Sequence, residues 1–175
     1  MNTDEIYQKI LKGIETGGRG LVRLNNSELD QLNQLLLQQK DLEKILCIIE
    51  HSAALYSPFE SSLIQLLSGP LNDQLTVFAL NCARKHIIQA RFQRGQRLDF
   101  NFLEILKKLL YSKNPEVVEW TLRTIEECSS QGVYFLREFD KIKPPPWKWF
   151  NAHQRAVREI ITMLERRWGQ FERSK

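Results

Sequence analysis

The residue types that could support catalysis are few and scattered along the chain. His51, His86 and His153 lie far apart in the sequence, and each falls near the end of an expected helix. There is no phosphate-binding glycine loop followed by Lys-Ser/Thr, no His-Glu-x-x-His motif and no Gly-x-Ser-x-Gly turn. A lone histidine in such a place is more often a cap or a surface residue than a general base. We therefore predict no catalytic residues and no enzyme activity.

Metal and cofactor chemistry has equally little support. Cys47, Cys82 and Cys128 are more than 30 residues apart and include no Cys-x-x-Cys pair. They lie among aliphatic residues at helical spacing, so we expect buried thiols that act as small hydrophobic residues. The glycine-rich residues 17–20 follow an expected helix and lack the later glycine of a nucleotide-binding loop. The sequence predicts no metal, no cofactor and no small-molecule substrate.

Basic residues provide the first indication of a binding function. Residues 1–83 carry a net charge of −4, whereas residues 84–175 carry +8. Residues 84–98 contain no acidic residue, which favours contact with phosphates or with an acidic protein face. The alternative is a solvated helix end whose positive charge complements the helix dipole. The residues predicted to contact a partner here are Arg84, Lys85, Arg91, Arg94 and Arg97.

Aromatic residues provide the second indication. Residues 133–150 hold 6 of the 17 aromatic residues, and the prolines at 144–146 favour an extended segment. Such a segment could anchor a partner, because Trp, Tyr and Arg dominate interface hot spots. Alternatively the aromatic residues pack into the last helices, although we expect Trp147 or Trp149 to be partly exposed. The predicted partner-binding residues are Tyr134, Trp147, Trp149 and Phe150, with the basic residues Lys148, Arg155 and Arg158.

These side chains must be positioned by helices, because apolar residues recur at helical spacing throughout and no convincing strand pattern occurs. The clearest start is at residues 57–60, where Ser57 is expected to cap, Pro58 to open the helix and Glu60 to reach back to the cap. We expect helices over residues 4–16 and from near Ser27, Ser57, Asn72, Asp99 and Asn114, with breaks at Gly132 and 144–146.

Four segments share a pattern of a shorter apolar helix, a polar break and a longer amphipathic helix. They are residues 29–51, 59–86, 100–128 and 133–168. Such irregular pairs, whose second helix begins with Asn/Asp-x-x-aliphatic, resemble HEAT repeats. The resemblance implies an all-α, right-handed α-solenoid of about four helical hairpins with an N-terminal capping helix. The Arg typical of the family is replaced by Thr76 and Val118, so an armadillo-like fold or an irregular helical bundle stays open.

The length of 175 residues is typical of one domain. We expect a single α-helical repeat domain over residues 1–175, with an N-terminal helix and loop at 1–26, helical pairs at 27–168 and a tail at 169–175. The first residues are polar and acidic, and no run of 18 apolar residues occurs. The sequence therefore predicts a cytoplasmic protein without membrane insertion.

The function that these features favour is that of a non-catalytic adaptor or scaffold for protein–protein interaction, with aromatic anchors and a basic rim. The alternative is a nucleic-acid-binding HEAT-like protein. It would use the basic residues at 84–97 together with a basic C-terminal helix that carries Arg155, Arg158, Arg166 and Arg167. The HEAT-like class also includes DNA glycosylases, in which Trp120, Trp147, Trp149 and Asp140 would take the base-contacting and carboxylate roles. The chain looks short for that family, and Trp120 aligns with Phe78 at a repeat core position.

Overall fold

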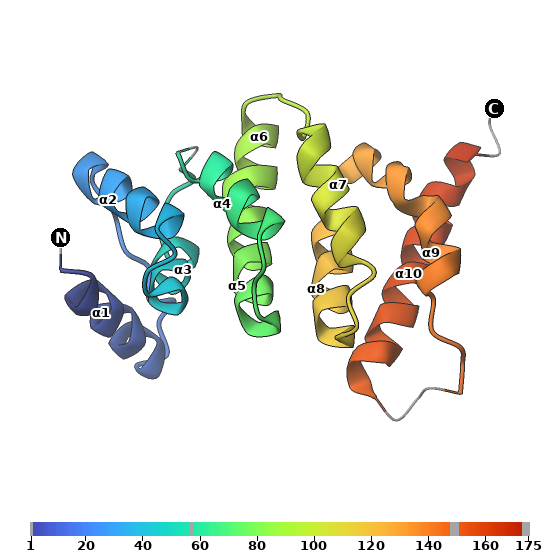
Figure 1. Cartoon of the computed structure of the whole chain (residues 1–175), viewed down its shortest axis with the longest axis horizontal. Coiled ribbons are helices and arrows are strands. Elements are labelled where there is room, and N and C mark those ends of the chain that lie inside the picture. Colours follow the sequence, from blue (N-terminus) through green and yellow to red (C-terminus); the bar gives the residue numbers. More distant parts are fainter. Residues whose placement is uncertain (1, 57, 148–150, 173–175) are drawn as a thin grey trace. The chain divides into compact units, whose positions relative to one another are not determined.

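The computed structural model describes residues 2–56, 58–147 and 151–172. Over these residues the regular structure is helical, and the only strand-like pairing is an isolated bridge between Val22 and Ser52 (Figure 1). The all-α prediction is therefore confirmed. No helix within the described ranges has both the length and the apolar character needed to cross a membrane. The chain divides into two compact units, unit 1 at Met1–Gln96 and unit 2 at Arg97–Lys175.

Unit 1 is built from consecutive helices that pack on one another. Helix α2 contacts α3 and α4, while α3 contacts α1 and α5. The last helix is continuous from α5 through a π-helical segment, η1, into α6, and π segments widen the helix locally. The elements are α1 (Thr3–Glu15), α2 (Asn26–Leu37), α3 (Leu42–Glu50), α4 (Phe59–Ser68), α5 (Asp73–Ala83), η1 (Arg84–Gln89) and α6 (Ala90–Gln93).

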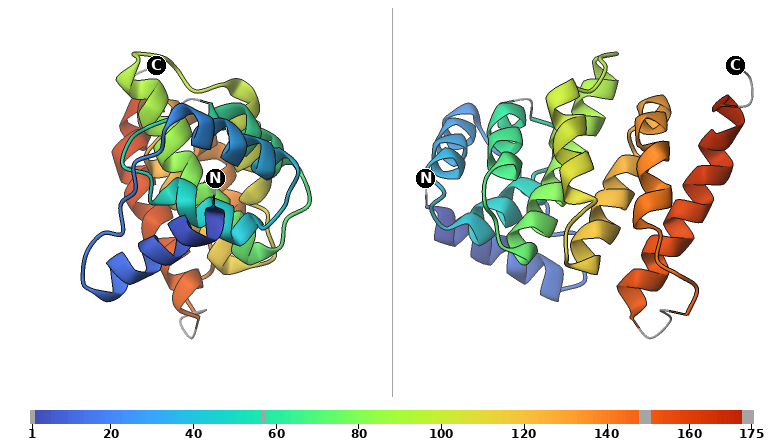
Figure 2. Two further views of the ribbon diagram at one scale, coloured as in Figure 1. Left: turned by 90° about the vertical axis from the view of Figure 1, so that its left-hand side faces the viewer. Right: turned by 45° about the vertical axis from the view of Figure 1, so that its right-hand side comes forward.

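Unit 2 follows the same style of packing. Helix α8 contacts α7 and α10, while α10 also contacts α9 and the 3-10 helix η2. The views of Figure 2 show α9 and α10 side by side, joined by the connection that carries the prolines. The elements are α7 (Phe100–Leu109), α8 (Pro115–Glu126), η2 (Ser129–Phe135), α9 (Leu136–Ile142) and α10 (Ala152–Glu172).

Most helix starts lie where the capping residues predict them. The side chains of Asn72, Asp99 and Asn114 accept backbone N–H bonds at the starts of α5, α7 and α8. At the start of α4 the helix is described from Phe59, directly after Pro58, and the Glu60 carboxylate binds Arg91 and Arg94. The predicted cap contacts with Ser57 are not among the described contacts. Ser57 lies outside the described residues.

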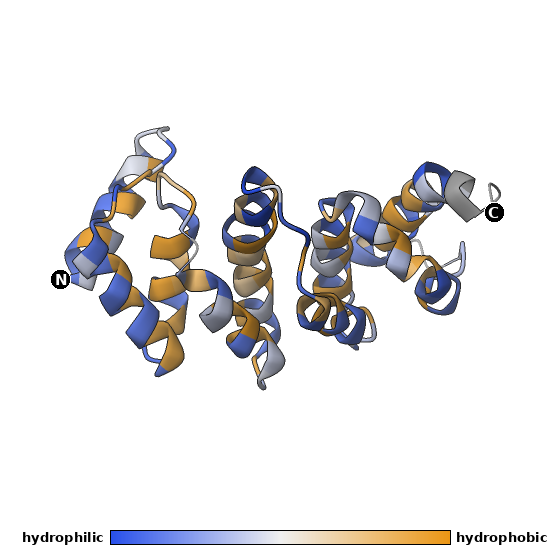
Figure 3. Cartoon of the chain, turned by 90° about the horizontal axis from the view of Figure 1, so that it is seen from above, coloured by the Kyte–Doolittle hydropathy of each residue, from blue (hydrophilic) through white to orange (hydrophobic). Residues whose placement is uncertain are grey.

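Each unit buries the apolar faces of its helices. Figure 3 shows hydrophobic faces turned toward neighbouring helices and hydrophilic faces turned outward. Phe59 and Leu63 are fully buried in unit 1, as are Phe102, Phe135 and Phe139 in unit 2. Two thiols are buried as predicted, those of Cys82 and Cys128, and burial raises the pKa of both; the thiol of Cys47 is only half-buried, and its pKa is raised as well.

The position of α10 depends on one close contact. Trp168 is 2% exposed, and its ring stacks on that of Phe139 with 6.4 Å between centroids. Its other neighbour is Gly132, which is buried inside η2 rather than forming a simple break. A Cβ atom at residue 132 would lie 2.1 Å from the Trp168 ring. Only glycine leaves room for the indole there, so Gly132 determines how closely α10 approaches η2.

We expect Gly132→Ala to lower the free energy of unfolding by about 1–3 kcal/mol, because the added methyl group overpacks the Trp168 site. Denaturant unfolding of the full chain, followed by circular dichroism, measures the change. Gly169→Ala is the matched control, since no atom lies within 4 Å of a Cβ atom there. The control should be neutral or stabilise by up to about 1 kcal/mol. Equal effects of the two substitutions would contradict the packing explanation.

Candidate functional site

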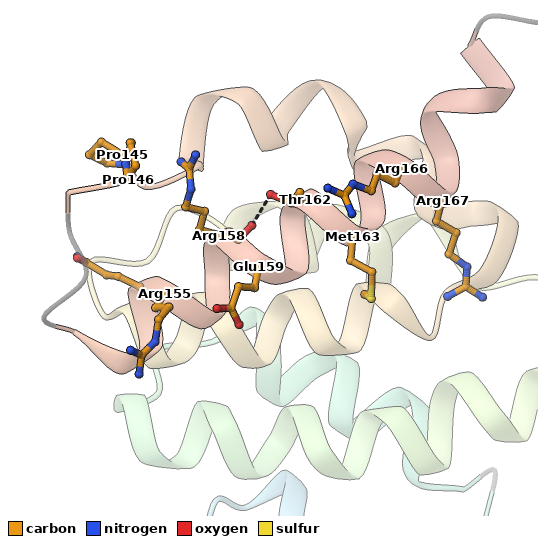
Figure 4. Close-up of a pocket in the computed structure, with 10 residues that line it drawn as sticks. Pro145, Pro146, Arg155, Arg158, Glu159, Thr162, Met163, Arg166 and Arg167 are labelled. Atoms are coloured by element: carbon orange, nitrogen blue, oxygen red, sulfur yellow. Dashed lines mark hydrogen bonds between the residues drawn. The ribbon is translucent and has the colours of Figure 1, made fainter.

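A groove of about 710 Å³ follows one face of α10. We call it the α10 groove. Figure 4 shows its side chains along the helix, with Pro145 and Pro146 at the end where α10 begins. The lining residues are Pro145, Pro146, Gln154, Arg155, Arg158, Glu159, Thr162, Met163, Arg166 and Arg167.

The amphipathic pattern of α10 determines which side chains line the groove. Val157, Ile161, Leu164 and Trp168 are buried, and α10 packs on α8, α9 and η2. Residues four apart share a helix face, so the opposite side carries two parallel rows. The first row consists of Arg155, Glu159, Met163 and Arg167, and the second of Arg158, Thr162 and Arg166.

The groove carries excess positive charge. Four arginines and one glutamate line it, so positively charged side chains outnumber negatively charged ones. Arg155, Arg166 and Arg167 are exposed, and no carboxylate that the structure describes lies within ion-pair distance of them. The groove can therefore attract anionic groups without first breaking an internal ion pair.

Pro145 and Pro146 form one wall of the groove, which we call the proline wall. A hydrogen bond to the preceding residue, Pro144, fixes the position of this wall. Arg158 donates from Nη1 to the carbonyl oxygen of Pro144, with 2.7 Å between the two atoms. Beside this wall Trp147 is 74% exposed, which confirms that one of the two tryptophans remains accessible. Trp149, Phe150 and Lys148 were also predicted to contact a partner, and they lie outside the described residues.

Tyr134 does not line the α10 groove. Its ring packs edge-on against Phe100 with 5.7 Å between centroids, and its hydroxyl donates to Glu104. Lys107 places its ammonium group 5.3 Å from the centre of the Tyr134 ring. Tyr134 therefore belongs to a separate surface cluster between η2 and α7, in which Phe100 is 63% exposed.

Within the predicted basic stretch, Lys85 and His86 cap the end of α3. Lys85 donates to the carbonyl oxygens of Glu50, at 3.1 Å, and of Ser52. His86 is fully buried, donates from Nε2 to the carbonyl of Ile49 at 2.9 Å, and accepts the N–H of Tyr56 at Nδ1. Carbonyls at a helix C-terminus lack helical partners and favour positive or N–H groups nearby. The π-helical segment thus presents both side chains to α3.

The remaining arginines of the stretch are also engaged. Arg91 and Arg94 both bind the carboxylate of Glu60, with 3.1 Å between Arg94 Nη2 and Glu60 Oε2. Arg84 is half-buried. Arg84 and Arg97 also make contacts within the protein. Arg97 falls in unit 2, whereas the others fall in unit 1. The structure therefore commits most of the predicted basic stretch to internal contacts.

His153 is also engaged in contacts within the protein. Its Nδ1 lies 2.8 Å from Oε2 of Glu119, whose other oxygen accepts two bonds from Arg123 at 2.9 and 2.7 Å. This cluster links α8 to the start of α10. Across the described ranges, no group of three His, Cys, Asp or Glu side chains could hold a metal ion.

Sequence reasoning identified the arginines of α10 but missed the groove. The proline segment was noted, but nothing in the sequence indicated that it lies beside Thr162 and Met163, although the four-residue spacing along α10 could have shown which residues share a helix face. Comparison with known protein families, curated proteins and solved structures finds no match for this chain. The HEAT-like resemblance stays a prediction.

We expect stability to fall as the pH is lowered through the range in which His86 titrates in the unfolded chain. Burial, reinforced by Lys85, lowers the pKa of His86 to about 4 from 6.5. Between pH 6.5 and 4 the unfolded chain therefore binds a proton that the folded protein does not. The free energy of unfolding should drop by up to about 3 kcal/mol across this window.

Denaturant unfolding at several pH values tests this expectation. Carboxylates also titrate near pH 4, so His86→Gln serves as the reference and should be less stable at pH 7 but less dependent on pH. The difference between the two proteins reports on His86 alone. Parallel pH profiles would show that His86 does not control acid stability.

Proposed function

We propose that this protein is a non-catalytic adaptor that binds an acidic segment of another protein in the α10 groove. The observation that carries the proposal is the pairing of an apolar surface with arginines for which the described part of the chain provides no carboxylate partner. Met163 is 40% exposed on the helix, and Pro145 and Pro146 form the wall. Apolar surface supplies affinity, while charge steers association and selects acidic partners.

Nucleic acid is the second candidate, supported by the same arginines and by exposed Trp147. A phosphate backbone is bound by many cations along an extended track, with bases stacked on several aromatic rings. The basic residues at 84–97 offer little toward such a track, because Lys85, Arg91 and Arg94 are engaged internally. This engagement favours a protein partner.

The proposal includes a scaffold of HEAT-like helical pairs. This part of the proposal is supported by contacts between the two helices of each predicted pair. Helix α2 packs on α3 and α4 on α5 in unit 1, and α7 packs on α8 in unit 2. The last predicted pair corresponds to η2 and α9 packed with α10. Stacked pairs of this kind share a core and leave helix faces available for partners.

A selection with random peptides on the purified full chain tests the proposal. We expect enriched sequences that combine acidic and apolar residues, and Arg166→Glu with Arg167→Glu should weaken their binding about tenfold or more. Lys108→Glu with Arg137→Glu, on exposed parts of α7 and α9, is the charge-matched control and should bind normally. Fluorescence anisotropy with labelled peptides provides the dissociation constants.

The same assay with single-stranded DNA separates the two candidates. We expect weak binding that disappears with salt, because four arginines neutralise few phosphates. Tight DNA binding that is lost in the Arg166→Glu, Arg167→Glu variant, together with no acidic enrichment among the peptides, would overturn the adaptor proposal in favour of a nucleic-acid-binding protein.

A further inference from the structure

The charges of the α10 groove are divided between its two ends. Arg155 and Arg158 lie near the start of α10, whereas Arg166 and Arg167 lie two to three turns later. Between the two pairs the groove presents Glu159, Thr162 and Met163, of which only Glu159 is charged. The groove therefore offers two anion-binding positions on either side of a partly apolar centre that carries no positive charge.

From this arrangement we propose that the partner segment is an extended peptide with two acidic side chains about four or five residues apart and an apolar residue between them. This inference rests on the proposed function, because it specifies the ligand of the same groove. It follows from the spacing of the charges, the width of the groove and the position of Glu159.

The spacing follows from helix geometry. With a rise of 1.5 Å per residue, Arg158 and Arg166 are separated by about 12 Å along α10, and Arg155 and Arg167 by about 18 Å. An extended chain advances about 3.3 Å per residue, so it covers these distances in about four or five residues. A helical ligand would need about eight to twelve residues between its acidic side chains.

The width favours the extended form. A volume of about 710 Å³ spread over about 18 Å gives a mean cross-section of about 40 Å². A helix with its side chains is about 10–12 Å across and needs roughly twice that section. An extended strand can lie along α10 within this section and pass Pro145 and Pro146 at the end where the helix begins, whereas a helix would extend well beyond the section.

Glu159 and Met163 determine the centre of the motif. Glu159 is exposed in the same row as Arg155 and Met163, so an acidic side chain placed opposite it would be repelled. Met163 is flexible and polarisable, which suits contact with apolar side chains of different shapes. The partner residue at the centre should therefore be apolar, and acidic residues there should weaken binding.

A series of synthetic peptides with fixed composition tests the inference. Each contains two glutamates and one leucine in a Gly/Ser background, with the glutamates about two to ten residues apart. We expect the tightest binding to the full chain at a separation of four or five residues, and about tenfold weaker binding at the extremes. Moving one glutamate beside the leucine should also weaken binding.

A charge exchange provides the matched control. The Arg166→Glu, Arg167→Glu variant should lose binding to the best peptide and regain it when one of the two glutamates is replaced by lysine, tested at each position in turn. The Lys108→Glu, Arg137→Glu variant should prefer the original peptide. Unchanged unfolding midpoints verify that both variants fold, as expected for exposed positions.

The possible failures are distinguishable. If peptides of every glutamate separation bind equally well and the Arg166→Glu, Arg167→Glu variant still loses affinity, the groove binds acidic partners regardless of the separation. Only this inference is then overturned. An optimum near eight to twelve residues would show a helical ligand and overturn it as well. If no acidic peptide binds and the selected peptides ignore the arginines, both the inference and the proposed function fail.

Discussion

The candidate site depends on how α10 packs against η2, α9 and α8. The indole of Trp168 fills the space left by the missing side chain of Gly132 and stacks on Phe139, while Glu119 holds His153 at the other end of the helix. Because both ends are held, the rotation of α10 about its axis is determined. The buried side then includes Val157, Ile161 and Leu164, and the arginine rows must face outward.

Internal ion pairs explain why the groove keeps its charge. In unit 2, Glu165 pairs with Lys143, and Glu119 with Arg123 and His153. The Tyr111 hydroxyl and Lys141 bond to Glu138 and, together with Lys107, lower the pKa of its carboxyl to about 2. These carboxylates are paired with side chains other than the arginines of the groove. The arginines of the groove are thus available to an external anion, although exposed charges attract it only over about 10 Å at ordinary ionic strength.

The basic stretch of unit 1 illustrates the opposite outcome. A π-helical segment brings Lys85 and His86 to the open carbonyls of α3, and the next turns bring Arg91 and Arg94 to Glu60. The partners of these residues lie 31 to 37 positions earlier in the chain. Charge density along a sequence is therefore a poor guide to a binding surface, because folding decides which charges meet opposite charges.

Local patterns in the sequence determined the all-helical class, most helix starts and the exposure of a tryptophan after the prolines. Caps such as Asn72, Asp99 and Asn114 act within a few residues, so they can be read directly. The groove could be predicted only in part. The arginines of α10 could be recognised in the sequence, but the bond of Arg158 to Pro144 and the contact of Gly132 with Trp168 join residues 14 or more positions apart. Such contacts arise from packing of whole helices, which local periodicity does not specify, and only the tertiary structure decided them.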